Sequence, residues 1–145
     1  MKVGVVGNPR YRDLRAVLEH VARQAPYRQL ILYSEERLKT FWPRDIPSFE
    51  GAELDALITF GGDGTLLRGA RLCTGREIPI LGVNLGRVGF LTTATRDTLD
   101  PALDALVAGR YVIERRQALQ AAIKDHEGNH RVNQLAVNDL SLIHI

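Results

Sequence analysis

Apolar residues recur along the chain with two different spacings, and each spacing predicts a strand or a helix. Residues 2–6 form a short apolar run that ends at Gly7-Asn8-Pro9, which is typical of a buried strand followed by a turn. From Asp13 the apolar positions follow one face of a helix, namely Leu14, Val17, Leu18, Val21 and Ala22. The pattern stops near Pro26, which predicts the end of this first helix.

Further apolar runs predict three more strands and two more helices. The expected strands cover residues 29–33, 54–60 and 79–84. Helical spacing resumes over residues 65–72, and a last helix is expected to begin at Asp97 or Thr98 and to end at Gly109. The residues of this last helix that are expected to face inward are Leu99, Leu103, Leu106 and Val107. Strands that alternate with helices predict an α/β fold: an open, mostly parallel, Rossmann-like sheet with helices on both faces.

The pattern changes after residue 110. Residues 111–125 and 130–145 are two long strand-like runs around a turn at residues 126–129, which predicts a β-hairpin. We therefore expect an α/β domain over residues 1–110, and over residues 111–145 the first strands of an all-β second domain. An isolated hairpin is at best marginally stable in water, and the chain stops inside an apolar run. We expect this second domain to be truncated.

Composition and charge narrow the classes of protein and of partner. The chain has 145 residues, of which 45% are hydrophobic and 25% charged, as in globular proteins. A net charge of +2 with scattered basic residues predicts no broad affinity for nucleic acid or anionic membranes. Cys73 is the sole cysteine, so we exclude an intramolecular disulfide and a cysteine-rich metal site, and expect it to pack as a small buried hydrophobe. Without a membrane span or a signal peptide, we expect a cytoplasmic protein.

A glycine turn follows the most apolar of the expected strands. Gly61-Gly62-Asp63-Gly64-Thr65 comes directly after residues 54–60 and opens the next helix. Glycines let a ligand approach the backbone, and successive N–H groups at a helix N-terminus attract anions. Open α/β sheets bind ligands at this edge. We therefore predict phosphate binding by Gly61, Gly62, Gly64 and Thr65, with a plain tight turn capped by Asp63 as the alternative.

Asp63 is the carboxylate within this turn. Its negative charge would repel phosphate unless a divalent cation intervenes or the carboxylate faces a substrate hydroxyl instead. Phosphoryl transfer needs positioning and charge neutralisation more than a strong base. An ordinary carboxylate can therefore accept the proton of an attacking hydroxyl late in the reaction.

Two further polar elements follow later apolar runs. Asn84-Leu85-Gly86-Arg87-Val88-Gly89-Phe90-Leu91-Thr92 begins at the end of a strand, so we expect it at the same edge of the sheet. Phe90 could cover an adenine or nicotinamide ring, or pack in the core. Asn138-Asp139 lies in an apolar run, where burial of the pair is costly unless something satisfies it. The amide can recognise a base edge and the carboxylate can accept from ribose hydroxyls; the alternative is a turn or strand-end pair.

In this order, the three elements resemble the NAD kinase family. The matching residues are Gly61-Gly62-Asp63-Gly64-Thr65, then Asn84-Leu85-Gly86 with Gly89-Phe90-Leu91-Thr92, then Asn138-Asp139. Residues 5–10 and Gly109-Arg110-Tyr111 also look like that family. A GGDG turn alone is shared with diacylglycerol and sphingosine kinases and with phosphofructokinases. The second element, about twenty residues later, is much more specific.

The resemblance implies a phosphotransferase that moves a phosphoryl group from ATP, or in some members polyphosphate, to the adenosine 2′-hydroxyl of NAD, aided by Mg²⁺. By position, Asp63 would accept the hydroxyl proton and Gly64 would contact NAD. Arg68 matches a basic position that touches the nucleotide in some members, with a solvated helix arginine as the alternative. The remaining implied contacts are Phe90 at the adenine pocket, and Asn138 and Asp139 at the adenosine and ribose of NAD.

The resemblance also bears on domains and partners. Family members continue into a β-domain whose Gly-Asp-Gly and Thr-Pro-Thr-Gly-Ser-Thr-Ala-Tyr segments complete the NAD pocket, and this chain has neither segment. Residues 1–110 would then be the nucleotide-binding domain. We expect small-molecule nucleotides as partners, no nucleic acid or membrane, and a homo-oligomeric full-length protein. The alternatives are a non-catalytic nucleotide-binding fragment and a GGDG-type kinase for a lipid or a sugar.

Overall fold

The computed structural model describes residues 1–87, 89–116, 118–124 and 130–137. The chain divides into two compact units, Met1–Tyr111 and Val112–Ile145, and each is described by itself. Within the described part of the chain, no helix is both long and apolar enough to cross a membrane.

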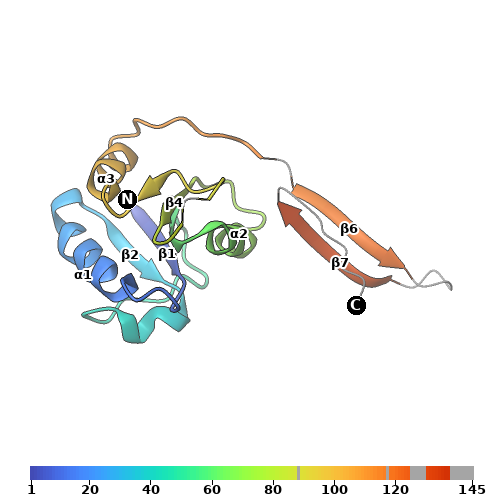
Figure 1. Ribbon diagram of the computed structural model, residues 1–145, viewed down its shortest axis with the longest axis horizontal. Coiled ribbons are helices and arrows are strands. Elements are labelled where there is room, and N and C mark those ends of the chain that lie inside the picture. Colours follow the sequence, from blue (N-terminus) through green and yellow to red (C-terminus); the bar gives the residue numbers. More distant parts are fainter. Residues whose placement is uncertain (88, 117, 125–129, 138–145) are drawn as a thin grey trace. The chain divides into compact units, whose positions relative to one another are not determined.

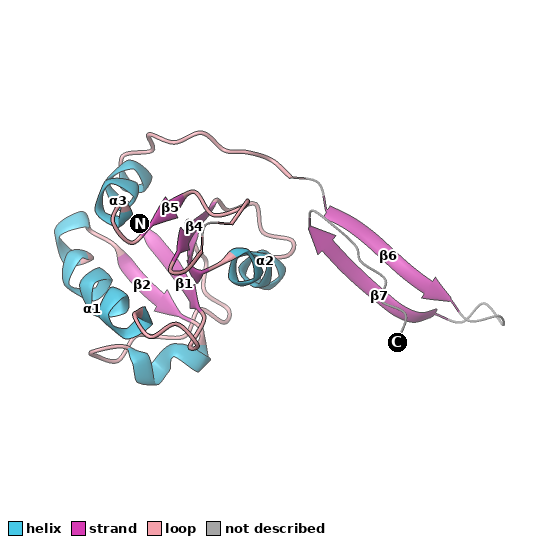
Figure 2. Cartoon of the chain, in the orientation of Figure 1, coloured by secondary structure: helices cyan, strands magenta, loops and turns pink. Residues whose placement is uncertain are grey.

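A five-stranded parallel sheet forms the centre of the first unit (Figure 1 and Figure 2). Its strands are β1 (Lys2–Gly7), β2 (Ile31–Ser34), β3 (Ala56–Gly61), β4 (Ile80–Asn84) and β5 (Ala94–Thr95), in the order β2-β1-β3-β4-β5. The register pairs Gly7 with Phe60, and Gly61 with Asn84. The carboxyl ends of β1, β3 and β4 therefore reach the same edge of the sheet, and the loops that follow them meet there.

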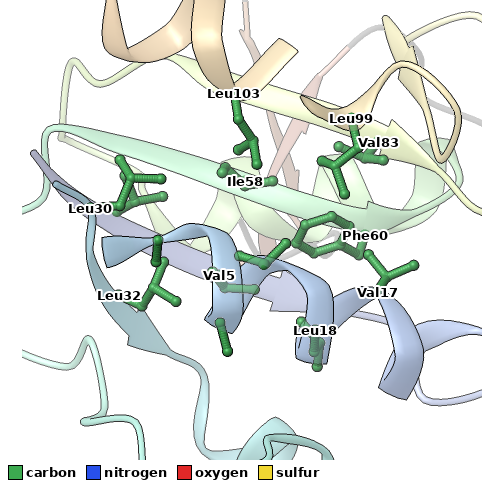
Figure 3. Packing of buried hydrophobic residues seen from close by; sticks show 14 of the residues in the cluster. Val5, Val17, Leu18, Leu30, Leu32, Ile58, Phe60, Val83, Leu99 and Leu103 are labelled. Atoms are coloured by element: carbon green, nitrogen blue, oxygen red, sulfur yellow. The ribbon is translucent and has the colours of Figure 1, made fainter. Parts of the chain in front are cut away.

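Helices cover both faces of the sheet, as predicted. They are α1 (Leu14–Gln24), α2 (Asp63–Leu72) and α3 (Leu99–Val107), with short 3-10 helices η1 (Pro26–Arg28) and η2 (Glu36–Phe41). Figure 3 shows side chains of α1 and α3 meeting Val5, Ile58 and Phe60 on one face. On the other face α2 lies close to the sheet, because a β-carbon at Gly69 would come within 2.8 Å of Leu57 and 2.7 Å of Thr59. Glycine at position 69 thus permits the close packing of α2.

The apolar spacing predicted the helices well and failed at one residue. All five apolar residues expected on the inner face of α1 are buried. In α3, Leu99, Leu103 and Leu106 are buried as expected, but Val107 is 41% exposed, so its inward assignment was wrong. Val107 is the last residue of α3. The positive φ of Gly109, 65°, agrees with its expected role as the helix terminator.

Short elements escaped the sequence analysis. The strand expected over residues 29–33 is Ile31–Ser34, and Gln29 instead adopts a left-handed conformation after η1. The two-residue strand β5 and the helix η2 have too few apolar positions to establish a period. Cys73 is buried as expected, and burial raises the pKa of its thiol.

The second unit contains an antiparallel pair, β6 (Ala118–Lys124) and β7 (His130–Val137), and the hairpin that would join these strands stays a prediction. The register pairs Ala118 with Val137. A strand starting at residue 111 was wrong, because residues 111–116 belong to no strand. Three charged side chains in residues 114–116 interrupt the alternation there. The expected turn at residues 126–129 lies outside the described residues, and the all-β second domain stays a prediction.

The two faces of α3 should differ sharply in their contribution to stability. Leu103 is fully buried, so Leu103→Ala should lower the free energy of unfolding by about 2–5 kcal/mol. Val107→Ala, on the same helix but exposed, should change it by less than about 0.5 kcal/mol. Urea unfolding monitored by circular dichroism measures both. Equal losses would mean that α3 does not pack through the face described.

Candidate functional site

Three loops meet at the carboxyl edge of the sheet. They are residues 8–11 after β1, the glycine turn (residues 61–65) after β3, and the second loop (residues 85–87 and 89–92) after β4. The backbone N–H of Asn8 donates to the Phe60 carbonyl at 3.0 Å, and that of Leu85 donates to the Gly61 carbonyl at 3.0 Å. Tyr11 lies against the other two loops, since a β-carbon at Gly86 would be 2.7 Å from its ring and one at Gly62 would be 3.3 Å from its hydroxyl.

The glycine turn opens α2 as predicted. Gly62 is the N-cap residue with an extended backbone, and Asp63 is the first residue of the helix. A β-carbon at Gly61 would lie 2.2 Å from the Thr65 hydroxyl oxygen, so Gly61 gives the Thr65 side chain its place. Thr65 is 5% exposed. Of the residues predicted to bind phosphate, Gly62, Gly64 and Thr65 line a cavity at this edge, whereas Gly61 is buried in β3.

This cavity, of about 270 Å³, is lined by three arginines as well as by the turn. Arg10 comes from the loop after β1, Arg37 from η2 and Arg68 from α2. The side chains of Arg10 and Arg37 form no ion pair or hydrogen bond with the described residues. Their charges are therefore not compensated within the described chain. Guanidinium groups beside a helix N-terminus make the cavity suited to a phosphate-bearing ligand.

Asp63 is held by the second loop. The Phe90 N–H donates to its Oδ2 at 2.8 Å, and the Leu91 N–H donates to its Oδ1 at 3.0 Å. Gly89 lies so close that a β-carbon there would be 2.2 Å from Oδ1. Hydrogen bonds from N–H groups to an ionised carboxylate are stronger than those between neutral groups. The two loops that the sequence singled out are thus joined through this one side chain, which is not tucked under its own helix.

The second loop is ordered by Asn84, the last residue of β4. Its Oδ1 accepts from the Gly86 N–H at 2.7 Å. Its Nδ2 donates to the Arg87 carbonyl at 2.7 Å and lies 3.3 Å from the Thr92 hydroxyl. Asn84 is 5% exposed, so its amide is shielded from water. These bonds supply the hydrogen-bond partners that a buried amide needs.

Arg68 is paired and only partly exposed. Its guanidinium makes a bidentate contact with the Glu35 carboxylate, in which Nη1 meets Oε2 and Nη2 lies 2.9 Å from Oε1. Nη2 also donates to the Gly7 carbonyl at 2.7 Å, while the Gly7 N–H donates to Glu35 Oε1 at 2.8 Å. The alternative of a solvated helix arginine was therefore wrong. The pair ties α2 to the ends of β1 and β2, and Arg68 still lines the cavity.

Phe90 is 96% exposed, so packing in the core, one of its two expected roles, was wrong. Its backbone lies at the edge of the sheet, where its N–H donates to Asp63. Contact with an adenine ring stays a prediction. Asn138 and Asp139 lie outside the described residues, and their expected roles stay predictions too.

The sequence analysis missed Glu35, Arg10, Arg37 and Tyr11 as residues of this edge. Glu35 directly follows β2, and a polar residue at the end of an expected strand is a signal that could have drawn attention to it. What the sequence does not show is that β2 lies beside β1 rather than elsewhere in the sheet. That neighbour relation brings Glu35 to Gly7 and Arg68.

Comparison with protein-family models gives one match over most of the first unit. Residues 3–111 match the model described as the ATP-NAD kinase N-terminal domain. The NAD kinase of Gemmatimonas aurantiaca is 43% identical over 140 residues, which cover 97% of this chain and 48% of that protein. The NAD kinase of Moorella thermoacetica is 35% identical over 142 residues, covering 96% and 45% respectively. The chain spans about half the length of the curated relatives it matches.

A solved structure shares the fold. The crystal structure of yeast NADH kinase complexed with NADH matches with a TM-score of 0.77 over 94% of this chain and 46% of that chain. The sequence identity is 19%, so this likeness concerns the fold alone.

The Arg68–Glu35 pair should matter more for stability than an exposed pair nearby. Arg68→Ala would leave the Glu35 carboxylate, 8% exposed, without its cation, and should lower the free energy of unfolding by about 1–3 kcal/mol. Lys39→Ala removes the exposed Lys39–Glu36 pair and should cost less than about 0.5 kcal/mol. Chemical unfolding of both variants at neutral pH makes the comparison. A cost for Arg68→Ala no larger than that of Lys39→Ala would contradict a stabilising role for the Arg68–Glu35 pair.

Proposed function

Because the chain belongs to the NAD kinase family, we propose that the protein transfers a phosphoryl group from ATP, or polyphosphate, to the 2′-hydroxyl of the adenosine ribose of NAD, giving NADP. The observation that carries the proposal is the position of Asp63. Its carboxylate is fixed at the carboxyl edge of a parallel sheet, at the start of the helix whose first turn lines an arginine-rich cavity. Acceptor and donor would approach the turn from its two sides.

Asp63 is the proton acceptor in this proposal. The ribose oxygen forms a bond to the terminal phosphorus of the donor, its proton passes to the Asp63 carboxylate, and the bond to the leaving oxygen breaks. Such transfers proceed through a loose transition state, so proton transfer comes late and an ordinary carboxylate suffices. The amides of Phe90 and Leu91 keep the carboxylate oriented toward the acceptor. No other chemistry is required of this side chain.

The arginine-lined cavity takes the phosphates of the donor. Arg10 and Arg37 bring two charges that the described residues do not compensate, and the start of α2 adds the partial positive charge of a helix end. Arg68 contributes less net charge, because Glu35 neutralises it. This cavity offers guanidinium groups and hydroxyls but little apolar surface, which favours a phosphate chain over a lipid tail.

The described residues of this edge contain no cluster of side-chain ligands for magnesium. Within the described part of the chain, no group of three or more His, Cys, Asp or Glu side chains could hold a metal ion. Both oxygens of Asp63 accept backbone N–H groups, and Glu35 is paired with Arg68. We infer that the metal would arrive with the donor phosphates.

On the acceptor side, the proposal keeps the contacts that the resemblance implies. Gly64 is exposed at the turn and would contact NAD, and the exposed ring of Phe90 would cover the adenine. Asn138 and Asp139 would hold the adenosine and ribose. The same proposal includes a homo-oligomeric protein in the cytoplasm. It also includes a division at residue 110 into a nucleotide-binding domain and the start of a β-domain.

Substitution of Asp63 tests the assigned role. Asp63→Asn keeps the size of the side chain but removes the proton acceptor, so kcat for NAD phosphorylation should fall by about 10²–10⁴-fold. The measurement is NADP formation by the complete gene product, coupled to an NADP-specific dehydrogenase. Far-ultraviolet circular dichroism and the melting temperature serve as the control for folding. Turnover retained in a folded Asp63→Asn variant would remove Asp63 from this role.

Substitution of the cavity arginines tests the donor site separately. Arg10→Gln and Arg37→Gln should each raise the KM for ATP by about three- to tenfold, because each removes one charge that would contact phosphate. The KM for NAD should stay the same. Arg71→Gln removes an exposed charge from the opposite end of α2 and is the matched control. If all three variants shift the KM for ATP equally, the effect is one of overall charge and the cavity is not the donor site.

A further inference from the structure

The contacts at the edge of the sheet form a chain from a buried amide to the carboxylate. Asn84 is anchored at the end of β4 and bonds to backbone groups of Gly86 and Arg87. The same loop then returns to Asp63 with the N–H groups of Phe90 and Leu91. The side-chain hydrogen bonds of Asn84 go to the second loop, so its effect on the carboxylate passes through that loop.

We propose that Asn84 is a positioning residue for Asp63, which acts by fixing the second loop so that two backbone amides hold the carboxylate in one orientation. This inference rests on the proposed function for its consequence on catalysis. The second loop then orients the Asp63 carboxylate through its backbone, besides any contact that its side chains make with a nucleotide.

The geometry explains why two amides are needed. The final torsion of an aspartate side chain is broad, so one contact would leave the carboxylate plane free to turn. Here each oxygen accepts from a different amide, at 2.8 Å and 3.0 Å, which defines the plane. A carboxylate accepts about four hydrogen bonds, so two amides do not by themselves prevent acceptance of a substrate hydroxyl. The two bonds therefore orient the Asp63 carboxylate without themselves blocking its acceptance of a substrate proton.

Gly89 provides an independent observation for the same contact. A β-carbon at this position would lie 2.2 Å from Oδ1, 2.6 Å from Cγ and 2.7 Å from Oδ2 of Asp63. The loop backbone therefore touches the whole carboxylate and leaves no room for a side chain. Gly89→Ala must displace either the loop or the carboxylate.

Amide hydrogen exchange on the complete gene product tests the contact without reference to activity. In Asp63→Ala the amides of Phe90 and Leu91 should exchange about tenfold faster, since each loses a charge-assisted hydrogen bond. Asn84→Ala should accelerate the same two amides. The amide of Asn8, bonded to the Phe60 carbonyl in the loop after β1, is the internal control and should not change. Unchanged exchange at Phe90 and Leu91 in either variant would overturn the proposal, whatever the protein phosphorylates.

Kinetics then separate positioning from a merely structural role. Asn84→Ala and Gly89→Ala should each lower kcat about tenfold or more with the KM for NAD unchanged, and the loss should vanish when Asp63 is already Asn. Thr74→Ala is the matched control, because it removes a side-chain bond to the Arg71 carbonyl at the far end of α2. If Asn84→Ala slows the Asp63→Asn variant by the same factor as the wild type, Asn84 does not act through Asp63. Should the wild type phosphorylate no NAD, the proposed function fails and the exchange result still decides the contact.

Discussion

The bond between the Asp63 carboxylate and the amides of Phe90 and Leu91 is the interaction on which this edge of the molecule depends. It joins the turn after β3 to the loop after β4, two segments that are far apart in sequence and adjacent only because β3 and β4 are parallel neighbours. The Asp63 carboxylate belongs to the turn whose neighbouring residues line the arginine-rich cavity. The amides hold it in place and so keep an anion next to a site for anions.

A second contact at this edge neutralises one of the three arginines of the cavity. Glu35 neutralises Arg68 and ties the ends of β1, β2 and α2 together through Gly7. Arg10 and Arg37 then supply the charge that a phosphate ligand would meet. One arginine of the cavity is therefore structural in its main contact, and two stay available for a ligand. Because Glu35 neutralises one of the three arginines, the fold accommodates a basic cavity with less net positive charge.

Sequence reasoning succeeded where the signal was local and failed where it depended on which strands are neighbours. The helical period of α1 and the apolar run of β3 predicted those elements, and the glycine turn predicted the start of α2. Glu35 and Tyr11 reach that edge only through the β2-β1-β3 order, which periodicity does not encode. Exposure at Val107 and Phe90 also depends on tertiary surroundings, so their burial could not be inferred from residue type.

The central claim is that this edge of the sheet directs a phosphoryl group to NAD rather than to another alcohol. The most direct measurement incubates the complete gene product with γ-³²P-labelled ATP and a mixture of NAD, diacylglycerol and fructose 6-phosphate, and separates the labelled products. We expect label in NADP and none in the lipid or the sugar phosphate. Label in either competitor, or ATP binding without any transfer, would contradict it.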